Sequence, residues 1–349
     1  MEKKVRCLIC RKESVNISEA LKVCLSCIRK SPEKAIPIAL EAHKKSRQAF
    51  GLPPNPPKGK YKCKLCVNEC GRQKGSVGYC GLEKSSSTQG KLSWYYDPLP
   101  TNCVADWVCA GGTGAGYPKY AYRDGPEYGY KNLAVFFHAC SFNCLYCQNW
   151  HFKKFTLTSE KKTVEELVAD IDNYVSCICY FGGDPTPQLP FAIKASRLAL
   201  EKAKGRILRI CWETNGSMNK RLLKEMMRLT LVSGGTIKFD IKAWNESLHI
   251  ALTGVTNKRT LENFKFASAM LQHRRTPPPL VASTLLVPGY IDVEEVRNIA
   301  RFIAKIDPQI PYSLLAFYPH FFMEDMGFTK RSLAEECYQE AKKAGLKNV

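Results

Sequence analysis

The sequence predicts an α/β protein. Its core is a partial (β/α)6, TIM-like barrel, and a cysteine-rich, metal-binding extension forms its N-terminus. After residue 130, short apolar segments alternate with helical patterns. Strands that are apolar on both faces and separated by helices are typical of a parallel sheet. Ten of the 17 cysteines precede residue 110, many of them in Cys-x2-Cys pairs.

Composition narrows the class of protein. The 349 residues are 45% hydrophobic and 24% charged, with a formal net charge of +20, which is typical of a globular chain. No apolar run reaches the ~18 residues of a transmembrane helix, and the charged start does not fit a secretory signal. We therefore expect a cytoplasmic protein without membrane contact, whose cysteines bind metal rather than form disulfides.

Residues 1–51 are expected to form a zinc-ribbon-like module with a helix over 31–51. Two Cys-x2-Cys knuckles supply four thiols, those of Cys7, Cys10, Cys24 and Cys27. Four thiolates about 2.3 Å from a zinc ion can hold a peptide too small to fold alone, and we favour zinc over iron–sulfur here. The first 60 residues carry 14 Lys and Arg against 5 Asp and Glu. This charge indicates either a solvated surface or a docking face for nucleic acid or a partner protein.

A linker and a second cysteine-rich region follow. Residues 52–60 contain four prolines and are expected to be a stiff, extended linker. Within 61–130, four further cysteines are expected to bind zinc or an auxiliary cluster that passes electrons inward, namely Cys63, Cys66, Cys70 and Cys80. From residue 83 we expect a long irregular connection, in which Cys103 and Cys109 are ordinary thiols or extra ligands.

Residues 131–349 are expected to form the α/β core. The predicted strands are 133–138, 175–181, 207–212, 236–242, 281–287 and 312–318. The predicted helices are 163–173, 189–204, 218–230, 257–273, 292–305 and 329–345. In folds of this class the chemistry lies at the carboxyl ends of the strands, so unusual residues should follow directly after each strand.

The first strand is followed by Cys140, Cys144 and Cys147, spaced Cys-x3-Cys-x2-Cys. Three protein thiolates on a four-iron cubane leave one iron free to bind a small molecule. A structural zinc ion would need a fourth ligand, which His138 or His151 could supply. Both metals therefore remain open for this loop by itself.

Later strand ends carry further polar motifs. Gly182-Gly183-Asp184-Pro185 allows close backbone approach to a ligand, although such a sequence is often only a turn. Glu213-Thr214-Asn215-Gly216 offers polar groups or simply begins a helix. Asp240 and Lys242 share one face of a strand and form either a ligand site or an internal ion pair. The remaining thiols are expected to be packing residues, namely Cys177, Cys179, Cys211 and Cys337.

Together these motifs resemble the radical SAM superfamily, whose cluster motif has the spacing of Cys140, Cys144 and Cys147. The resemblance implies a [4Fe-4S] cluster on these thiols, Tyr146 beside the adenine of S-adenosylmethionine (SAM), and residues 182–185 around its methionyl amino group, with Asp184 in place of the usual Glu. Residues 213–216 and 239–264 are similar to the glycyl-radical-enzyme (pyruvate formate-lyase) activating enzymes. Over residues 61–349 the chain most resembles their AmmeMemoRadiSam-type relatives, although residues 92–131 are longer than usual and residues 1–30 are additional.

By the same resemblance, Asp240, Lys242 and His249 are expected around the cofactor and substrate, and Glu213, Thr214 and Asp240 beside a monovalent cation. The implied activity is reductive cleavage of SAM to a 5′-deoxyadenosyl radical, which abstracts hydrogen from a glycyl radical enzyme or another macromolecule. The alternatives are radical modification of RNA or a small metabolite, and a non-catalytic zinc-ribbon module that binds nucleic acid or protein. We expect a flavodoxin or ferredoxin as electron donor, and no cobalamin because no segment fits a cobalamin-binding domain.

Overall fold

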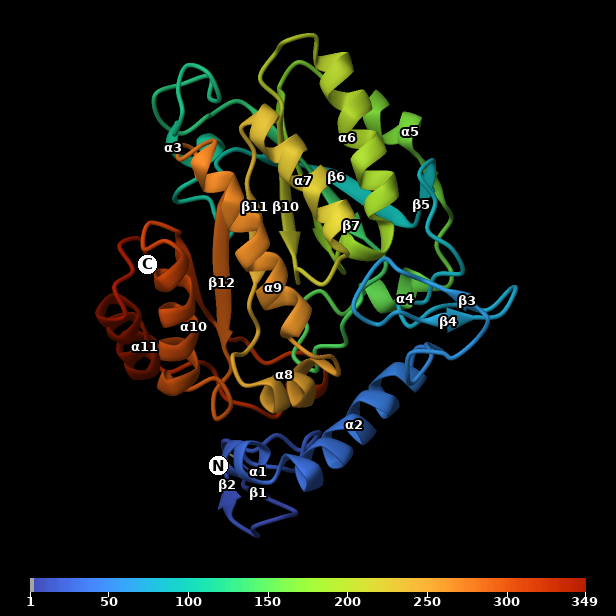
Figure 1. The fold of residues 1–349 in the computed structure, drawn as a ribbon, viewed down its shortest axis with the longest axis vertical. Helices are drawn as coiled ribbons and strands as arrows, with labels where there is room; N and C mark the ends of the chain where they lie inside the picture. The colour runs from blue at the N-terminus through green and yellow to red at the C-terminus, as the bar shows by residue number, and fades with distance from the viewer. Residues whose placement is uncertain (1–2) are drawn as a thin grey trace.

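A seven-stranded sheet forms the centre of the computed structural model, which describes residues 3–349 (Figure 1). Its strand order is β13-β12-β11-β10-β9-β7-β6. Six of its strands run parallel, namely β7 (Lys131–Phe137), β9 (Val175–Gly182), β10 (Arg209–Thr214), β11 (Ile237–Asp240), β12 (Leu280–Leu286) and β13 (Tyr312–Ala316). These strands overlap the six predicted from the sequence, and the α/β class with a parallel sheet is confirmed.

The seventh strand corrects the expectation of an irregular connection from residue 83 onward. β6 (Leu92–Pro98) pairs antiparallel with β7, from Leu92 opposite Phe137 to Pro98 opposite Lys131. Its aromatic side chains are anchored outside the sheet, since Trp94 Nε1 donates to Asp170 Oδ2 at 2.5 Å and the Tyr96 hydroxyl donates to the Asp170 carbonyl at 2.6 Å. The strand is half exposed and lies at an edge, so it lacks the apolar run by which the inner strands are recognised.

Helices cover one face of the sheet. The six predicted helices correspond to α5 (Val164–Ala169), α6 (Leu189–Ala203), α7 (Lys220–Ser233), α9 (Lys258–Ala267), α10 (Val293–Ile306) and α11 (Arg331–Lys343). An eighth helix in chain order, α8 (Glu246–Thr253), was not predicted. The Asn245 side chain accepts a hydrogen bond from the Leu248 amide at its start, and Gly254 ends it with φ of 76°. These are ordinary helix boundaries, but they enclose too short a segment to show a clear helical period.

The remaining elements are short. They are α3 (Ala110–Thr113), α4 (Phe152–Thr156), β3 (Tyr61–Lys62), β4 (Gly71–Arg72), β5 (Gln89–Gly90) and β8 (Lys162–Thr163), with 3-10 turns at Thr186–Gln188, Ser268–Gln272 and Phe321–Met323. No helix in residues 3–349 has both the length and the apolar character needed to span a membrane.

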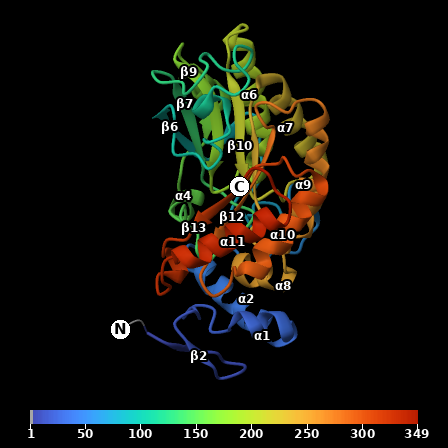
Figure 2. The same cartoon turned by 90° about the vertical axis from the view of Figure 1, so that its left-hand side faces the viewer.

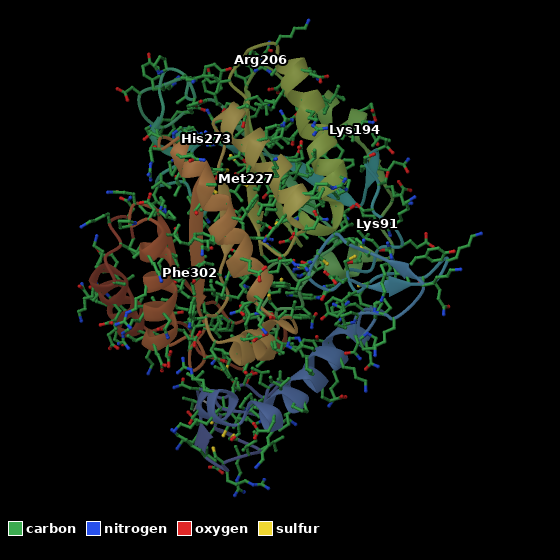
Figure 3. All side chains as sticks on the ribbon, in the orientation of Figure 1. Lys91, Lys194, Arg206, Met227, His273 and Phe302 are labelled. Carbon is green, nitrogen blue, oxygen red and sulfur yellow. The ribbon has the colours of Figure 1, made fainter. Side chains whose placement is uncertain are left out.

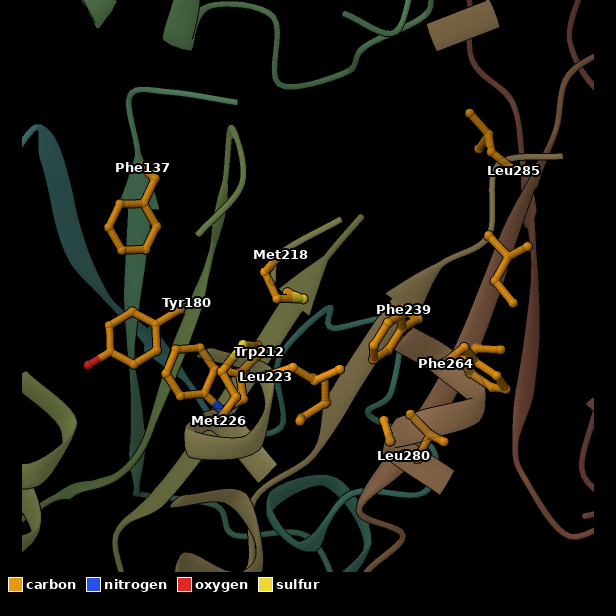
Figure 4. Close-up of a cluster of buried hydrophobic side chains, with 14 of the residues drawn as sticks. Phe137, Tyr180, Trp212, Met218, Leu223, Met226, Phe239, Phe264, Leu280 and Leu285 are labelled. Atoms are coloured by element: carbon orange, nitrogen blue, oxygen red, sulfur yellow. The ribbon is translucent and has the colours of Figure 1, made fainter. Parts of the chain in front are cut away.

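The two faces of the sheet differ in chemistry because side chains alternate along each strand. The outer face, toward the helices, is apolar, and Figure 4 shows Tyr180, Trp212, Phe239 and Phe264 within this core. Farther out, Lys194 lies on the exposed surface of α6 (Figure 3). The opposite, inner face carries polar, charged and thiol side chains, including those of Cys179, Lys238 and Ser283. Burial of the outer face stabilises the fold, and the inner face is left for chemistry.

The N-terminal residues form a small module that packs on this core. It contains β1 (Val5–Arg6), β2 (Glu13–Ser14), α1 (Leu25–Lys30) and α2 (Pro32–Gln48), and it lies beneath α8 in Figures 1 and 2. Arg29 donates to Asp292 and Glu295 at the start of α10, at 2.8 Å to each. The Ser18 amide donates to the Tyr290 hydroxyl at 3.0 Å. The module is therefore fastened to the core by buried and half-buried polar contacts.

Candidate active site and metal centres

Most of the residues expected to hold the catalytic-loop cluster, SAM or substrate line one cavity of about 180 Å³ on the inner face of the sheet. They come from the ends of four strands and are Cys140, Cys144, Tyr146, Cys147, Gly182, Gly183, Asp184, Glu213, Asn215, Asp240 and Lys242. Pro185, Thr214 and His249 are not among the lining residues. The expectation that the motifs meet at the carboxyl ends of the strands is thus met by the geometry.

The loop of Cys140, Cys144 and Cys147 runs between β7 and α4. Backbone hydrogen bonds fix it against the end of α8: the Asn143 amide donates to the Thr253 carbonyl at 2.9 Å, and the Leu145 amide donates to the Leu252 carbonyl at 3.1 Å. Burial raises the pKa of all three thiols. A metal ion or cluster must therefore displace their protons to bind.

The Gly182-Gly183 turn lies against this loop. At Gly182, where φ is +96°, a Cβ would lie 2.7 Å from the Phe137 amide nitrogen, and at Gly183 it would lie 2.3 Å from the Ala139 carbonyl oxygen. From the sequence, these two glycines are expected to let the backbone approach a ligand closely. The structure shows that these glycines also permit close approach of two backbone segments, because any side chain would separate β9 from the cysteine loop.

Asp184 joins the glycine turn to the segment after β10. Its carboxylate accepts hydrogen bonds from the Thr186 amide at 2.7 Å, the Asn215 amide at 2.7 Å and the Thr214 hydroxyl at 3.1 Å. Burial outweighs these bonds and raises its pKa to about 6. Asp184 therefore links the glycine turn to the segment after β10, and Thr214 contacts it from outside the cavity lining.

Asp240 is held between two ammonium groups on the inner face of β11. Lys238 Nζ lies 3.2 Å and Lys242 Nζ 3.0 Å from its carboxylate, and Ser283 Oγ donates to it at 2.7 Å. Burial opposes ionisation, but the two lysines lower the pKa of Asp240 well below its usual range. Lys238 also pairs with Glu213 at 2.9 Å. Asp240 and Lys242 thus form the expected internal ion pair, and both also line the cavity.

Tyr146 and His249 differ in their surroundings. The Tyr146 hydroxyl is buried, lines the cavity and has no hydrogen-bond partner within residues 3–349. An orphaned hydroxyl beside three thiols fits a cavity that accepts a polar cofactor. His249 lies behind the cysteine loop, where its Nδ1 donates to the Val255 carbonyl at 2.6 Å and its ring packs edge-on to Phe142 at 5.3 Å. It touches the loop rather than the cavity.

The N-terminal cysteines form a tight group within the module. The ligand atoms of Cys7, Cys10, Cys24 and Cys27 all lie within 4.8 Å of one another. Cys7 and Cys27 sulfurs are 3.8 Å apart, and those of Cys10 and Cys24 are 3.7 Å apart. Tetrahedral thiolates about 2.3 Å from a zinc ion are themselves about 3.8 Å apart. This geometry fits one metal ion held by four thiolates.

The second cysteine set is looser and packs on the cysteine loop. Among residues 3–349, the N-terminal group alone has three or more such ligand atoms within 4.8 Å, so Cys63, Cys66, Cys70 and Cys80 do not form a ready single-ion site. The Asn68 amide group donates to the Ser141 carbonyl at 2.6 Å, and Tyr79 and Cys70 share an apolar cluster with Phe142. This set therefore lies directly beside the loop of Cys140.

Sequence reasoning missed a buried polar network behind the loop. His43 on α2 hydrogen-bonds the Ala251 carbonyl through Nε2 and the Asn143 side chain through Nδ1, both at 3.0 Å. Lys153 Nζ donates to Asn143 Oδ1 at 2.7 Å. No local motif marks these residues. Lys238 was detectable, because it alternates with Asp240 and Lys242 on one strand.

Comparison with known proteins agrees with this geometry. Residues 134–303 match the sequence profile of the Radical SAM superfamily. A Methanocaldococcus jannaschii protein, named as a glycyl-radical enzyme activating enzyme, is 28% identical over 190 residues, covering 53% of this chain and 67% of that protein. The pyruvate formate-lyase-activating enzyme of Staphylococcus aureus is 29% identical over 209 residues, covering 56% of this chain and 76% of that enzyme.

A solved structure adds little to this. The crystal structure of Streptococcus suis SuiB bound to S-adenosylmethionine aligns over 58% of this chain and 45% of that one, at 13% identity and a TM-score of 0.43. A likeness at that level supports no argument. The superfamily implied by the profile uses a [4Fe-4S] cluster and SAM. The cysteine loop and the glycine turn both lie inside the segment, residues 134–303, that matches the Radical SAM superfamily profile, and the two relatives are named as activating enzymes.

Proposed function

We propose that this enzyme cleaves SAM reductively at a [4Fe-4S] cluster held by Cys140, Cys144 and Cys147. The observation that carries the proposal is the convergence of these thiols with the motifs of three later strands on one cavity. When bound, the cluster supplies one electron that breaks a C–S bond of SAM and releases methionine and a 5′-deoxyadenosyl radical.

The chain's own residues position this chemistry. Cys140, Cys144 and Cys147 hold the cluster, and the open backbone of Gly182 and Gly183 meets the methionyl part of the cofactor. Tyr146 and Asn215 line the cavity and offer it an aromatic ring and an amide. The charged group of Glu213, Asp240 and Lys242 fixes the orientation of cofactor and substrate. Bound cofactor and substrate would fill the cavity and exclude water from a reactive radical.

The other cysteine sets have separate roles in the proposal. Cys7, Cys10, Cys24 and Cys27 hold zinc, because their spacing suits one tetrahedral ion. The second set holds an auxiliary iron–sulfur cluster rather than zinc. Its sulfurs are spaced more widely than those of the N-terminal group, and the set packs on the cysteine loop. Its members are Cys63, Cys66, Cys70 and Cys80. A flavodoxin or ferredoxin supplies the electron.

The favoured substrate is a glycyl radical enzyme, from which hydrogen is abstracted at a glycine. Support comes from the names of the two relatives and from the group around Asp240, whose motif resembles that of activating enzymes. Incubation with a candidate partner, SAM and reductant should give a glycyl radical signal in electron paramagnetic resonance. RNA as substrate predicts instead retention on RNA that falls steeply with salt.

The cluster assignment is tested by electron paramagnetic resonance of the anaerobically reconstituted, reduced protein. SAM should change the spectrum of the reduced cluster, because one iron has no protein ligand. The Cys144→Ala variant should lose that SAM-dependent change, whereas Cys337→Ala, a buried thiol on α11, should keep it. A spectrum that ignores SAM in the wild type would overturn the proposal.

A further inference from the structure

Three cysteines that were expected to be core residues face the inner side of the sheet. Cys177 and Cys179 are two residues apart on β9 and point to the same side. Cys211 on β10 is the register partner of Cys179 and points that way too. None of the three belongs to the main apolar cluster between sheet and helices, which takes Ile178, Tyr180 and Ile210 from the same strands. Packing against the helices therefore does not explain these thiols.

The connection between β6 and β7 brings two more cysteines to the same place. Cys103 donates to Glu213 Oε1 at 3.3 Å. The segment that carries it is fastened to β13, since Trp107 Nε1 donates to Ser313 Oγ at 3.0 Å and Ser313 Oγ donates to the Val104 carbonyl at 3.1 Å. Cys109 begins α3, where its sulfur accepts a hydrogen bond from the Gly112 amide at 3.3 Å. This segment thus lies across the inner face, opposite the strand thiols.

All five thiols line one cavity of about 40 Å³. Arg209, Glu213 and Lys238 share it, and Glu213 and Lys238 also line the larger cavity proposed for SAM. The thiol cavity is therefore the immediate neighbour of the candidate active site. Arg209 and Lys238 also line it, and each is paired with a carboxylate, Arg209 with Glu127 and Lys238 with Glu213.

The spacing of the thiols decides which occupant fits. Thiolates bind zinc, copper(I) and iron–sulfur clusters. Within residues 3–349, no three of these five sulfurs lie within 4.8 Å of one another, in contrast to the N-terminal group. Cys140, Cys144 and Cys147, for which a cluster is proposed, likewise do not form such a group. A polynuclear centre fits such spacing better than one tetrahedral ion does.

We propose that Cys103, Cys109, Cys177, Cys179 and Cys211 supply the ligands of a further iron–sulfur cluster on the inner face of the sheet. Four of the five suffice, because two-iron and four-iron clusters each take four thiolates. The small cavity favours the two-iron form. This cluster would lie inside the sheet's concavity, beside the cavity for SAM, and is separate from the set of Cys63 and from the N-terminal module.

The test uses the full chain, reconstituted anaerobically with ferrous iron and sulfide, and counts iron and acid-labile sulfide per chain. The variant Cys103→Ser/Cys109→Ser changes only an irregular segment and a helix start. Serine at position 109 still accepts the Gly112 amide, so the cap is kept. This variant should lose about two irons and two sulfides for a two-iron cluster, and Cys337→Ala should lose none.

A second variant, Cys179→Ser/Cys211→Ser, removes ligands from the strands and should cause the same loss. Retained N-terminal zinc and an unchanged circular dichroism spectrum show that a variant is folded. Unchanged iron and sulfide counts in both folded variants would overturn the proposal. Because Cys144→Ala should keep this cluster, failure of SAM cleavage and failure of this inference are distinguishable.

Discussion

At the scale of single residues, the side chains that build the site were predictable and their partners were not. Cys140, Asp184 and Asp240 each follow or end an apolar strand, which is visible in the sequence. The three hydrogen bonds that Asp184 accepts come from a different strand end and from its own turn, and only the folded sheet brings these donors together. The same holds for His43, which reaches Asn143 from a helix 100 residues earlier.

Gly182 provides a test of backbone approach. Gly182→Ala should destabilise the fold by about 1–3 kcal/mol more than Gly205→Ala, and should reduce iron bound by the cysteine loop. Both glycines have positive φ, but a Cβ at Gly205 meets nothing within 4 Å, whereas one at Gly182 lies 2.7 Å from a backbone nitrogen. Urea unfolding measures the difference, and equal effects of the two substitutions would contradict the steric argument.

His43 makes stability depend on pH. Burial lowers its pKa to about 4, below the ~6.5 of an unfolded histidine. The folded state therefore gains stability above pH ~6.5, and this is lost as the pH falls toward 4, by about 3 kcal/mol in total. His43→Gln can keep both hydrogen bonds without titrating. Its unfolding free energy should fall less between pH 6.5 and 4 than that of the wild type, and parallel curves would rule out this role.

At the scale of elements, strands and helices with strong periodic patterns were predicted correctly, and those stabilised by partners were missed. β6 exists because β7 offers a free edge, and α8 because it packs against α2 and the cysteine loop. Neither cause is local in the sequence, so tertiary contact overrides a weak local pattern.

The docking of α1 on α10 depends on Arg29. Arg29→Ala leaves Glu295, whose side chain is 2% exposed, without its cation. Removal of one partner leaves the other charge buried and unpaired. We expect Arg29→Ala to lower the free energy of unfolding by about 2–4 kcal/mol, a value that already allows for the partly exposed Arg29 side chain. Arg197→Ala is the matched control, because its pair with Glu225 is much more exposed and is worth less than about 1 kcal/mol. Guanidinium unfolding should separate the two variants, and similar losses would show that docking has another source.

At the scale of the whole molecule, the 17 cysteines divide by location. Four lie in the N-terminal module, four in the second cysteine-rich region, and three in the cysteine loop. Five line the small cavity, three of them on the inner face of the sheet and two on the connection between β6 and β7, and Cys337 lies on α11. The sequence separated the first three sets by their spacing. It could not reveal the fourth, because residues far apart in the chain share a site only after the sheet forms.

The N-terminal set should hold one zinc ion independently of the iron. Cys24→Ser should remove that ion and loosen the module, because metal binding and folding are coupled in a segment this small. The iron count should not change. Elemental analysis of the purified variant measures both metals, and loss of iron along with zinc would mean that the module is required for cluster assembly.

The proposed function depends on reductive cleavage of SAM at the cysteine loop. The most direct measurement is the yield of 5′-deoxyadenosine when the anaerobically reconstituted protein is incubated with SAM and dithionite. We expect 5′-deoxyadenosine and methionine in equal amounts from the wild type, and none above background from Cys144→Ala. Absence of the nucleoside from a wild-type protein with a full iron count, or undiminished formation by Cys144→Ala, would contradict the claim.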